Sequence, residues 1–123
     1  MLTGIAVIEL HVHDSHSLKA KRGVVRSLAG RLRNRFNVSV AEVGGQGTWQ
    51  RATLGLAMVG NEEPALRRGL ERAIDFVEGT HLAQVLSSDV EIVAAPLEGA
   101  AGEAMLADDD EAPWASNLRS GAE

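Results

Sequence analysis

The feature that most constrains the fold is the order in which strand-like and helix-like apolar patterns follow one another. Residues 3–13 alternate in polarity, which predicts a strand with one buried side. Residues 17–36 instead repeat at helical spacing after Ser17, a predicted N-cap. The predicted core residues of these two segments are Ala6, Ile8, Leu10 and Val12 of the strand and Leu18, Val25, Leu28, Leu32 and Phe36 of the helix.

The remaining elements complete a recognisable order. Residues 37–43 and 49–60 are predicted strands joined by a glycine-rich reversal. A helix is predicted from the cap Asn61 to Gly79, with Pro64 in its first turn. A last strand is predicted over about residues 89–96. The order β-α-β-β-α-β predicts a ferredoxin-like α+β fold, the split βαβ pattern, with a four-stranded antiparallel sheet and two helices on one face.

Charge divides the chain into two parts. Residues 1–98 contain eleven basic and eleven acidic side chains, so the formal net charge of −5 arises entirely in residues 99–123. That segment is rich in Ala and Gly, acidic and without periodicity. We therefore predict a domain over residues 1–98 and a disordered acidic tail over residues 99–123.

The first predicted helix is strongly basic. Seven of the twelve Lys and Arg residues lie between Ser17 and Asn37, and no acid interrupts them. The negative end of the helix dipole accounts for cations in the last turn, but not for those at the start. A helix N-terminus with added cations suits an anion. The predicted RNA-binding or phosphate-binding residues are Ser17, Lys19, Lys21, Arg22, Arg26 and Arg33.

Three kinds of partner fit this basic helix. The favoured one is structured RNA or the ribosome, held through phosphate contacts. The second is a protein partner, in which case the chain is a dimeric protein-interaction module that binds no nucleic acid. The third is a small phosphorylated metabolite at the Ser17 end. Base stacking on the sheet is not expected, because aromatic residues make up only 3% of the chain.

The sheet face opposite the helices is predicted to be small and apolar. Such a surface is unfavourable in water, so we predict that it packs against a second copy in a homodimer. A ligand groove is the alternative use. The predicted interface residues are Ile5, Val7, Ala41, Val43, Gly55, Ala57 and Val59.

The sequence does not predict an enzyme. It has no cysteine, no glycine-rich phosphate loop, and no third group to orient a histidine beside Ser15 or Ser17. The histidines His11, His13 and His16 lack a second ligand cluster, so no metal or cofactor is predicted. No signal peptide is evident and no apolar run approaches the roughly 20 residues of a membrane span, so we expect a cytoplasmic protein without membrane contact.

Three segments together resemble a known family. The stretches SLKAKR, RNRFNVSVAEV and WQRATLGLAMV are similar to the YlxP-like family of small bacterial proteins, a domain of unknown function, over about residues 1–96. The resemblance implies a ferredoxin-like fold and a gene near translation factors, including initiation factor two and ribosome-binding factor A, with no established activity. The matching positions are Ser17, Leu18, Lys19, Lys21, Arg22, Asn34, Phe36, Asn37, Glu42, Trp49 and Gly55.

Overall fold

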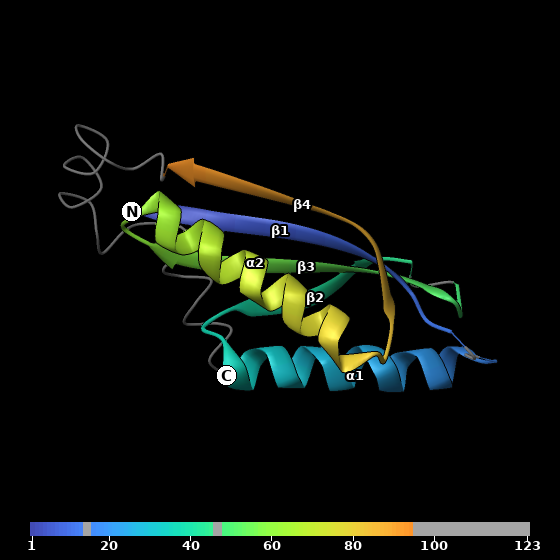
Figure 1. Ribbon diagram of the computed structural model, residues 1–123. Coiled ribbons are helices and arrows are strands. Elements are labelled where there is room, and N and C mark those ends of the chain that lie inside the picture. Colours follow the sequence, from blue (N-terminus) through green and yellow to red (C-terminus); the bar gives the residue numbers. More distant parts are fainter. Residues whose placement is uncertain (14–15, 46–47, 95–123) are drawn as a thin grey trace, which may run out of the picture.

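The computed structural model describes residues 1–13, 16–45 and 48–94 (Figure 1). In chain order, its elements are β1 (Leu2–His11), α1 (Leu18–Arg35), β2 (Ser39–Gly44), β3 (Arg51–Gly60), α2 (Glu63–Thr80) and β4 (Gln84–Ala94). This order confirms the predicted ferredoxin-like α+β fold. None of the described helices is long and apolar enough to cross a membrane.

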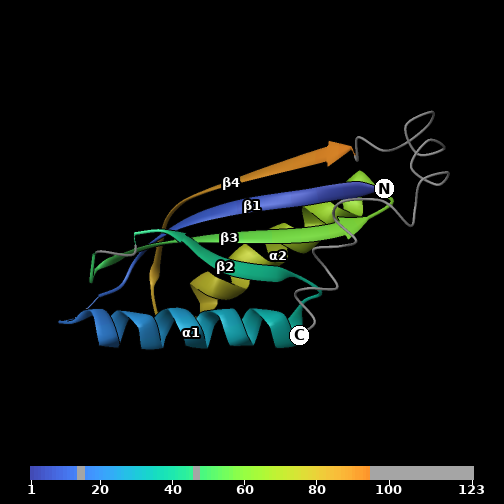
Figure 2. The ribbon, with the colours of Figure 1, turned by 180° about the vertical axis from the view of Figure 1, so that it is seen from behind.

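The sheet is antiparallel throughout, in the order β2-β3-β1-β4. β1 and β3 pair without a break from Leu2 opposite Gly60 to His11 opposite Arg51. β4 pairs with the other side of β1, with an irregularity between Glu9 and Leu10. Both helices lie on one side, and the other side is uncovered (Figure 2). We call this uncovered side the open face.

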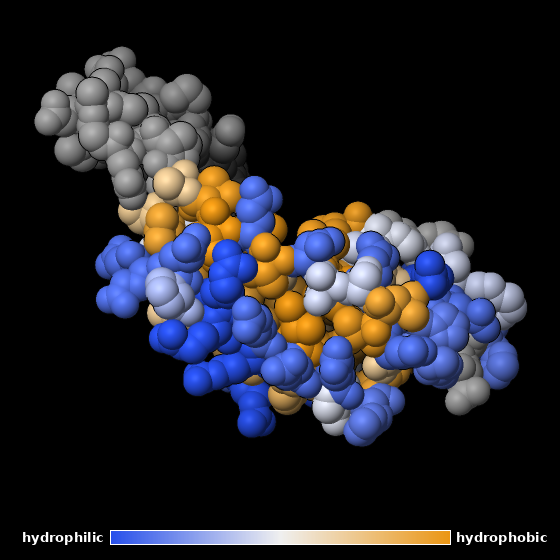
Figure 3. All heavy atoms as spheres, turned by 45° about the horizontal axis from the view of Figure 1, so that its top comes forward, coloured by the Kyte–Doolittle hydropathy of each residue, from blue (hydrophilic) through white to orange (hydrophobic). Residues whose placement is uncertain are grey.

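Strand alternation separates the core from the open face. Ala6, Ile8 and Leu10 of β1 and Leu54 of β3 point toward the helices and are buried. α2 contacts β1, β3 and β4, whereas the main contacts of α1 are with β2 and α2. α1 therefore covers the β2 side of the sheet. In the oblique view of Figure 3, apolar residues extend from the centre of the molecule to its upper margin, and hydrophilic residues lie mainly below and to either side of them.

Several predicted boundaries were wrong by a few residues. β4 starts at Gln84, before the predicted residue 89, because its pairing with β1 continues to His11. α2 begins after Glu62 without a side-chain cap, so Asn61 does not cap it. It also continues past Gly79, because Thr80 Oγ1 donates to Val77 O at 2.7 Å and accepts from Leu82 N at 3.3 Å, which stabilises the turn.

Two other expectations had different outcomes. Leu18, predicted in the core, is exposed at the start of α1. The predicted boundary between a domain and an acidic tail at residues 98 and 99 lies outside the described residues.

We expect Gly30→Ala to stabilise the protein. Gly30 lies inside α1, and a Cβ there would meet nothing within 4 Å. Alanine should raise the free energy of unfolding by about 0.5–1 kcal/mol through its higher helix propensity. Gly45→Ala is the contrasting control, because Gly45 has a φ of 79° and a Cβ would lie 2.8 Å from Arg51 O. Urea unfolding should show a gain for Gly30→Ala and a loss for Gly45→Ala; a loss for both would contradict this account.

Candidate anion-binding groove on the first helix

The start of α1 is fixed by a side-chain cap. Ser17 has an extended backbone and its Oγ accepts a hydrogen bond from Ala20 N at 3.0 Å. This confirms Ser17 as the N-cap. The first turn contains no acidic residue, whereas Arg33 and Arg35 occupy the last turn, where the helix dipole favours cations.

Lys21 is a buried residue, not a surface cation. Its relative accessibility is 0%, and Nζ donates to Glu42 Oε2 at 3.1 Å, to Gly45 O at 2.6 Å and to Arg51 O at 3.3 Å. An ammonium group has three protons, and these acceptors use all of them. The prediction that Lys21 belongs to the anion site is therefore wrong.

The contacts of Lys21 give it a structural role. Glu42 lies near the end of β2, Gly45 directly follows β2, and Arg51 begins β3. One ammonium group therefore links α1 to both ends of the connection between β2 and β3. Helical spacing could have revealed this role. Lys21 precedes Val25 by four residues and Leu28 by seven, which places it on the buried side of the helix.

The remaining predicted cations lie on the outer part of α1. Lys19, Arg22, Arg26 and Arg33 are exposed and fall within one narrow sector of the helix. Three of them, Arg22, Arg26 and Arg33, line a groove of about 250 Å³ between α1 and β2. Its other lining residues are Val25, Ala29, Ala41 and Glu42. Of the other predicted residues, Lys19 lies one turn before Arg22, and Ser17 lies at the helix start.

The exposed cations of α1 are not neutralised by the described part of the fold. The ion pair that the structure gives α1 within residues 1–13, 16–45 and 48–94 is Lys21 with Glu42. Arg33 Nη2 donates to Val40 O at 2.6 Å, and Arg35 lies over the Phe76 ring at 5.1 Å from its centroid. Lys19, Arg22 and Arg26 have no carboxylate partner among the described residues. The groove therefore presents guanidinium groups suited to phosphate oxygens.

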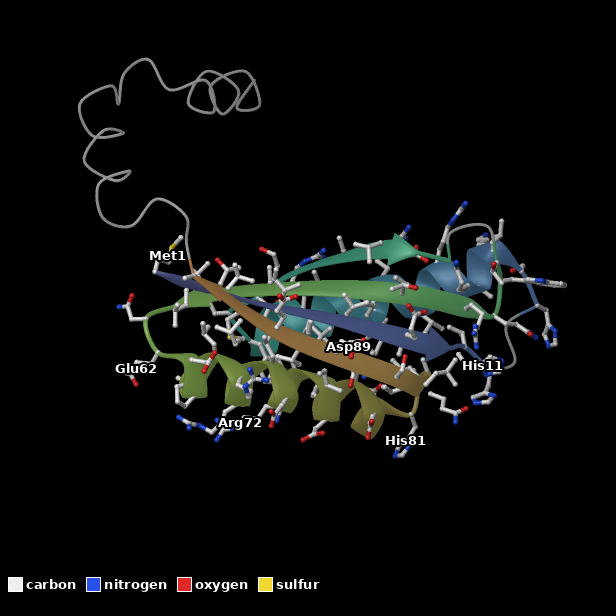
Figure 4. All side chains as sticks on the ribbon, turned by 90° about the horizontal axis from the view of Figure 1, so that it is seen from above. Met1, His11, Glu62, Arg72, His81 and Asp89 are labelled. Atoms are coloured by element: carbon white, nitrogen blue, oxygen red, sulfur yellow. The ribbon has the colours of Figure 1, made fainter. Side chains whose placement is uncertain are left out.

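Among the described residues, the histidine cluster does not assemble into a metal site. The rings of His11 and His13 meet edge to face with centroids 4.3 Å apart, and His13 Nε2 lies 3.0 Å from Gln84 Oε1. The described residues contain no group of three acidic, histidine or cysteine side chains that could hold a metal ion. His11 lies at the end of the molecule opposite Met1 and Glu62 (Figure 4), away from the first residues of the sheet.

Comparisons with known proteins identify relatives but no activity. The model of a family described as "Protein of unknown function (DUF503)" matches residues 3–90. "Uncharacterized protein YlxP" of Bacillus subtilis (strain 168) is 38% identical over 77 residues, which cover 63% of this chain and 84% of that protein. A solved structure of a variant of SnoaB, a cofactor-independent oxygenase from Streptomyces nogalater, matches with a TM-score of 0.43 and 12% identity, over 76% of this chain and 93% of its own.

We expect Lys21→Met to destabilise the fold. Glu42 would keep a largely buried carboxylate, only 20% exposed, without the ammonium that now contacts it. Removing one partner of a buried ion pair lowers the free energy of unfolding by about 3 kcal/mol or more. The double variant Lys21→Met with Glu42→Leu should recover most of that loss, because both charged groups are then removed. Chemical denaturation of the parent, single and double variants measures this difference. Equal stability of the parent and Lys21→Met would contradict the structural role.

Proposed function

This chain belongs to the DUF503 family, and we propose that it is a non-enzymatic cytoplasmic protein that binds structured RNA or the ribosome through the basic outer side of α1. Membership assigns no activity, because the family is one of unknown function. The proposal rests on one observation, the groove lined by Arg22, Arg26 and Arg33 without a neutralising acid among the described residues other than Glu42, which is bonded to Lys21.

The shape of α1 supports a large polyanion. Gly23 and Gly30 lie beside these arginines on the helix, outside the lining of the groove, and a Cβ at either position would meet nothing within 4 Å. Each helical glycine costs about 1 kcal/mol relative to alanine, and packing within the described fold gives no reason for it. Because glycine has no side chain, these two positions leave room for the sugar-phosphate backbone of an RNA to approach the helix closely.

The proposed contacts are to phosphates rather than to bases. Phe36, at the end of α1, and Phe76, in α2, pack against each other with centroids 5.8 Å apart, so neither ring is free to stack on a base. Trp49 is exposed, but it does not line the groove. Phosphate contacts position a nucleic acid without reading its sequence. Double-stranded RNA is recognised largely by shape and backbone, which favours a structured RNA over a single strand.

A binding role suits the chemistry of the groove better than catalysis. Among its lining residues, Glu42 carries the carboxylate, and that carboxylate is already bonded to Lys21 Nζ. The guanidinium groups of the arginines are hydrogen-bond donors that suit the binding of phosphate. The resemblance to YlxP-like proteins implies genes near translation factors, which also supports an RNA or ribosomal partner in the cytoplasm.

Removing the outer cations of α1 should weaken RNA binding. We expect Lys19→Gln, Arg22→Gln and Arg26→Gln, combined, to lower affinity for a hairpin RNA at least tenfold at about 50 mM salt. The slope of log affinity against log salt should fall by about 2 to 3, because three phosphate contacts are lost. Fluorescence anisotropy across a salt series measures both quantities.

The control is a triple variant with the same charge change on α2. Arg67→Gln, Arg68→Gln and Arg72→Gln remove three exposed cations from a helix that also carries Glu71 and Asp75. This variant should bind nearly as well as the parent. Equal weakening of RNA binding by both triple variants would show that the loss of affinity depends on net charge alone and not on the position of the cations. A parent chain that binds neither hairpin RNA nor ribosomal subunits would overturn the proposal and favour the protein-interaction module.

A further inference from the structure

We propose that the open face is the interface of a symmetric homodimer in which β1 of each copy packs over β3 of the other. All the predicted interface residues lie on this face, which Figure 2 shows free of helices. It is formed by Thr3, Ile5, Val7 and Glu9 of β1, Thr53, Gly55, Ala57 and Val59 of β3, Ser39, Ala41 and Val43 of β2, and Ser87, Asp89, Glu91 and Val93 of β4.

The open face exposes several large apolar side chains to solvent. Its exposed large side chains are Ile5, Val7, Val43, Val59 and Val93. Ile5, Val7, Val43 and Val59 border the small residues Ala41, Gly55 and Ala57. No charged residue lies among these seven, and the carboxylates of this face are those of Glu9, Asp89 and Glu91. A contiguous apolar patch of this kind on a small domain marks an interaction surface.

The shape of the open face favours one relative orientation of the two copies. Ser39, Ala41, Gly55 and Ala57 line a hollow of about 220 Å³ between β2 and β3. On β1, the larger Ile5 pairs with Ala57 and Val7 pairs with Gly55. A two-fold axis parallel to the strands, between β1 and β3, places Ile5 and Val7 of each copy over Ala57 and Gly55 of the partner subunit. Ile5 and Val7 of each copy then lie over the residues that line the hollow of the other copy.

Charge selects the same axis. The carboxylates Asp89 and Glu91 lie on the open face along β4, where Figure 4 marks Asp89. β2 and β3 contribute no acid to this face, and Arg33 binds Val40 O at the edge of β2. The axis parallel to the strands places β4 over β2 of the partner subunit, so acids lie near a cationic edge. An axis perpendicular to the strands would stack β4 on β4 and bring like charges together.

The size of the open face is adequate for a stable pair. Four strands about 4.8 Å apart, with ten residues of about 3.4 Å each, span roughly 650 Å² before allowing for the shorter β2. Two such faces bury about 1,200 Å² in total, at the lower end of specific protein–protein interfaces.

The oligomeric state of the full chain tests the interface. Sedimentation equilibrium should give twice the chain mass of 13.0 kDa. Val7→Lys should yield a folded monomer. Leu18→Lys is the matched control, because Leu18 is 36% exposed and Val7 37% exposed, but Leu18 lies on α1. A parent that stays monomeric at all concentrations, or a dimer that survives Val7→Lys, would overturn the proposal. Circular dichroism verifies that each variant is folded.

Crosslinking tests the axis. The chain contains no cysteine, so single introduced cysteines report one position each. Mixed Asp89→Cys and Ala41→Cys chains should be joined by a short bismaleimide, since β4 of one copy faces β2 of the other about 10 Å away. Asp89→Cys chains alone should not be joined. Efficient self-crosslinking of Asp89→Cys, without the mixed product, would establish the other axis and overturn this arrangement.

Discussion

One buried ammonium group connects the parts of the chain on which the candidate groove depends. Lys21 reaches from the first turns of α1 to Glu42, Gly45 and Arg51. Because α1 contacts mainly β2 and α2, this contact fixes the helix against the sheet edge at its amino-terminal end. The position of Arg22 and Arg26 beside β2 follows from that attachment. A cation that resembles a binding residue in the sequence thus holds the candidate groove in place.

The order of strands and helices was predictable because the apolar residues of each element recur at the spacing typical of a strand or of a helix. β1 and β3 alternate, and α2 repeats Leu66, Leu70, Ile74 and Val77 on one side. The boundaries were less predictable where capping signals are weak. His81, with a φ of 56°, takes a left-handed position usually occupied by glycine, so Gly79 was a misleading signal for the helix end.

The candidate site was only partly predictable. Charge pattern identified the arginines, but local sequence does not show which distant acceptors approach a lysine. The acceptors of Lys21 lie 21 to 30 residues away in the chain and meet it only through the strand connection. Likewise, the sequence predicted Arg33 as one of the cations of the basic first helix but could not show its bond to Val40 O, because that bond depends on how closely α1 approaches β2.

The bond from Arg33 to Val40 O also affects how this sheet can grow. An edge strand offers free carbonyl and amide groups that can pair with another chain. The guanidinium occupies one such carbonyl on β2, and α1 lies alongside, so the β2 edge is a poor template for strand addition. The fold thereby protects part of this edge of the sheet from strand addition by a second chain.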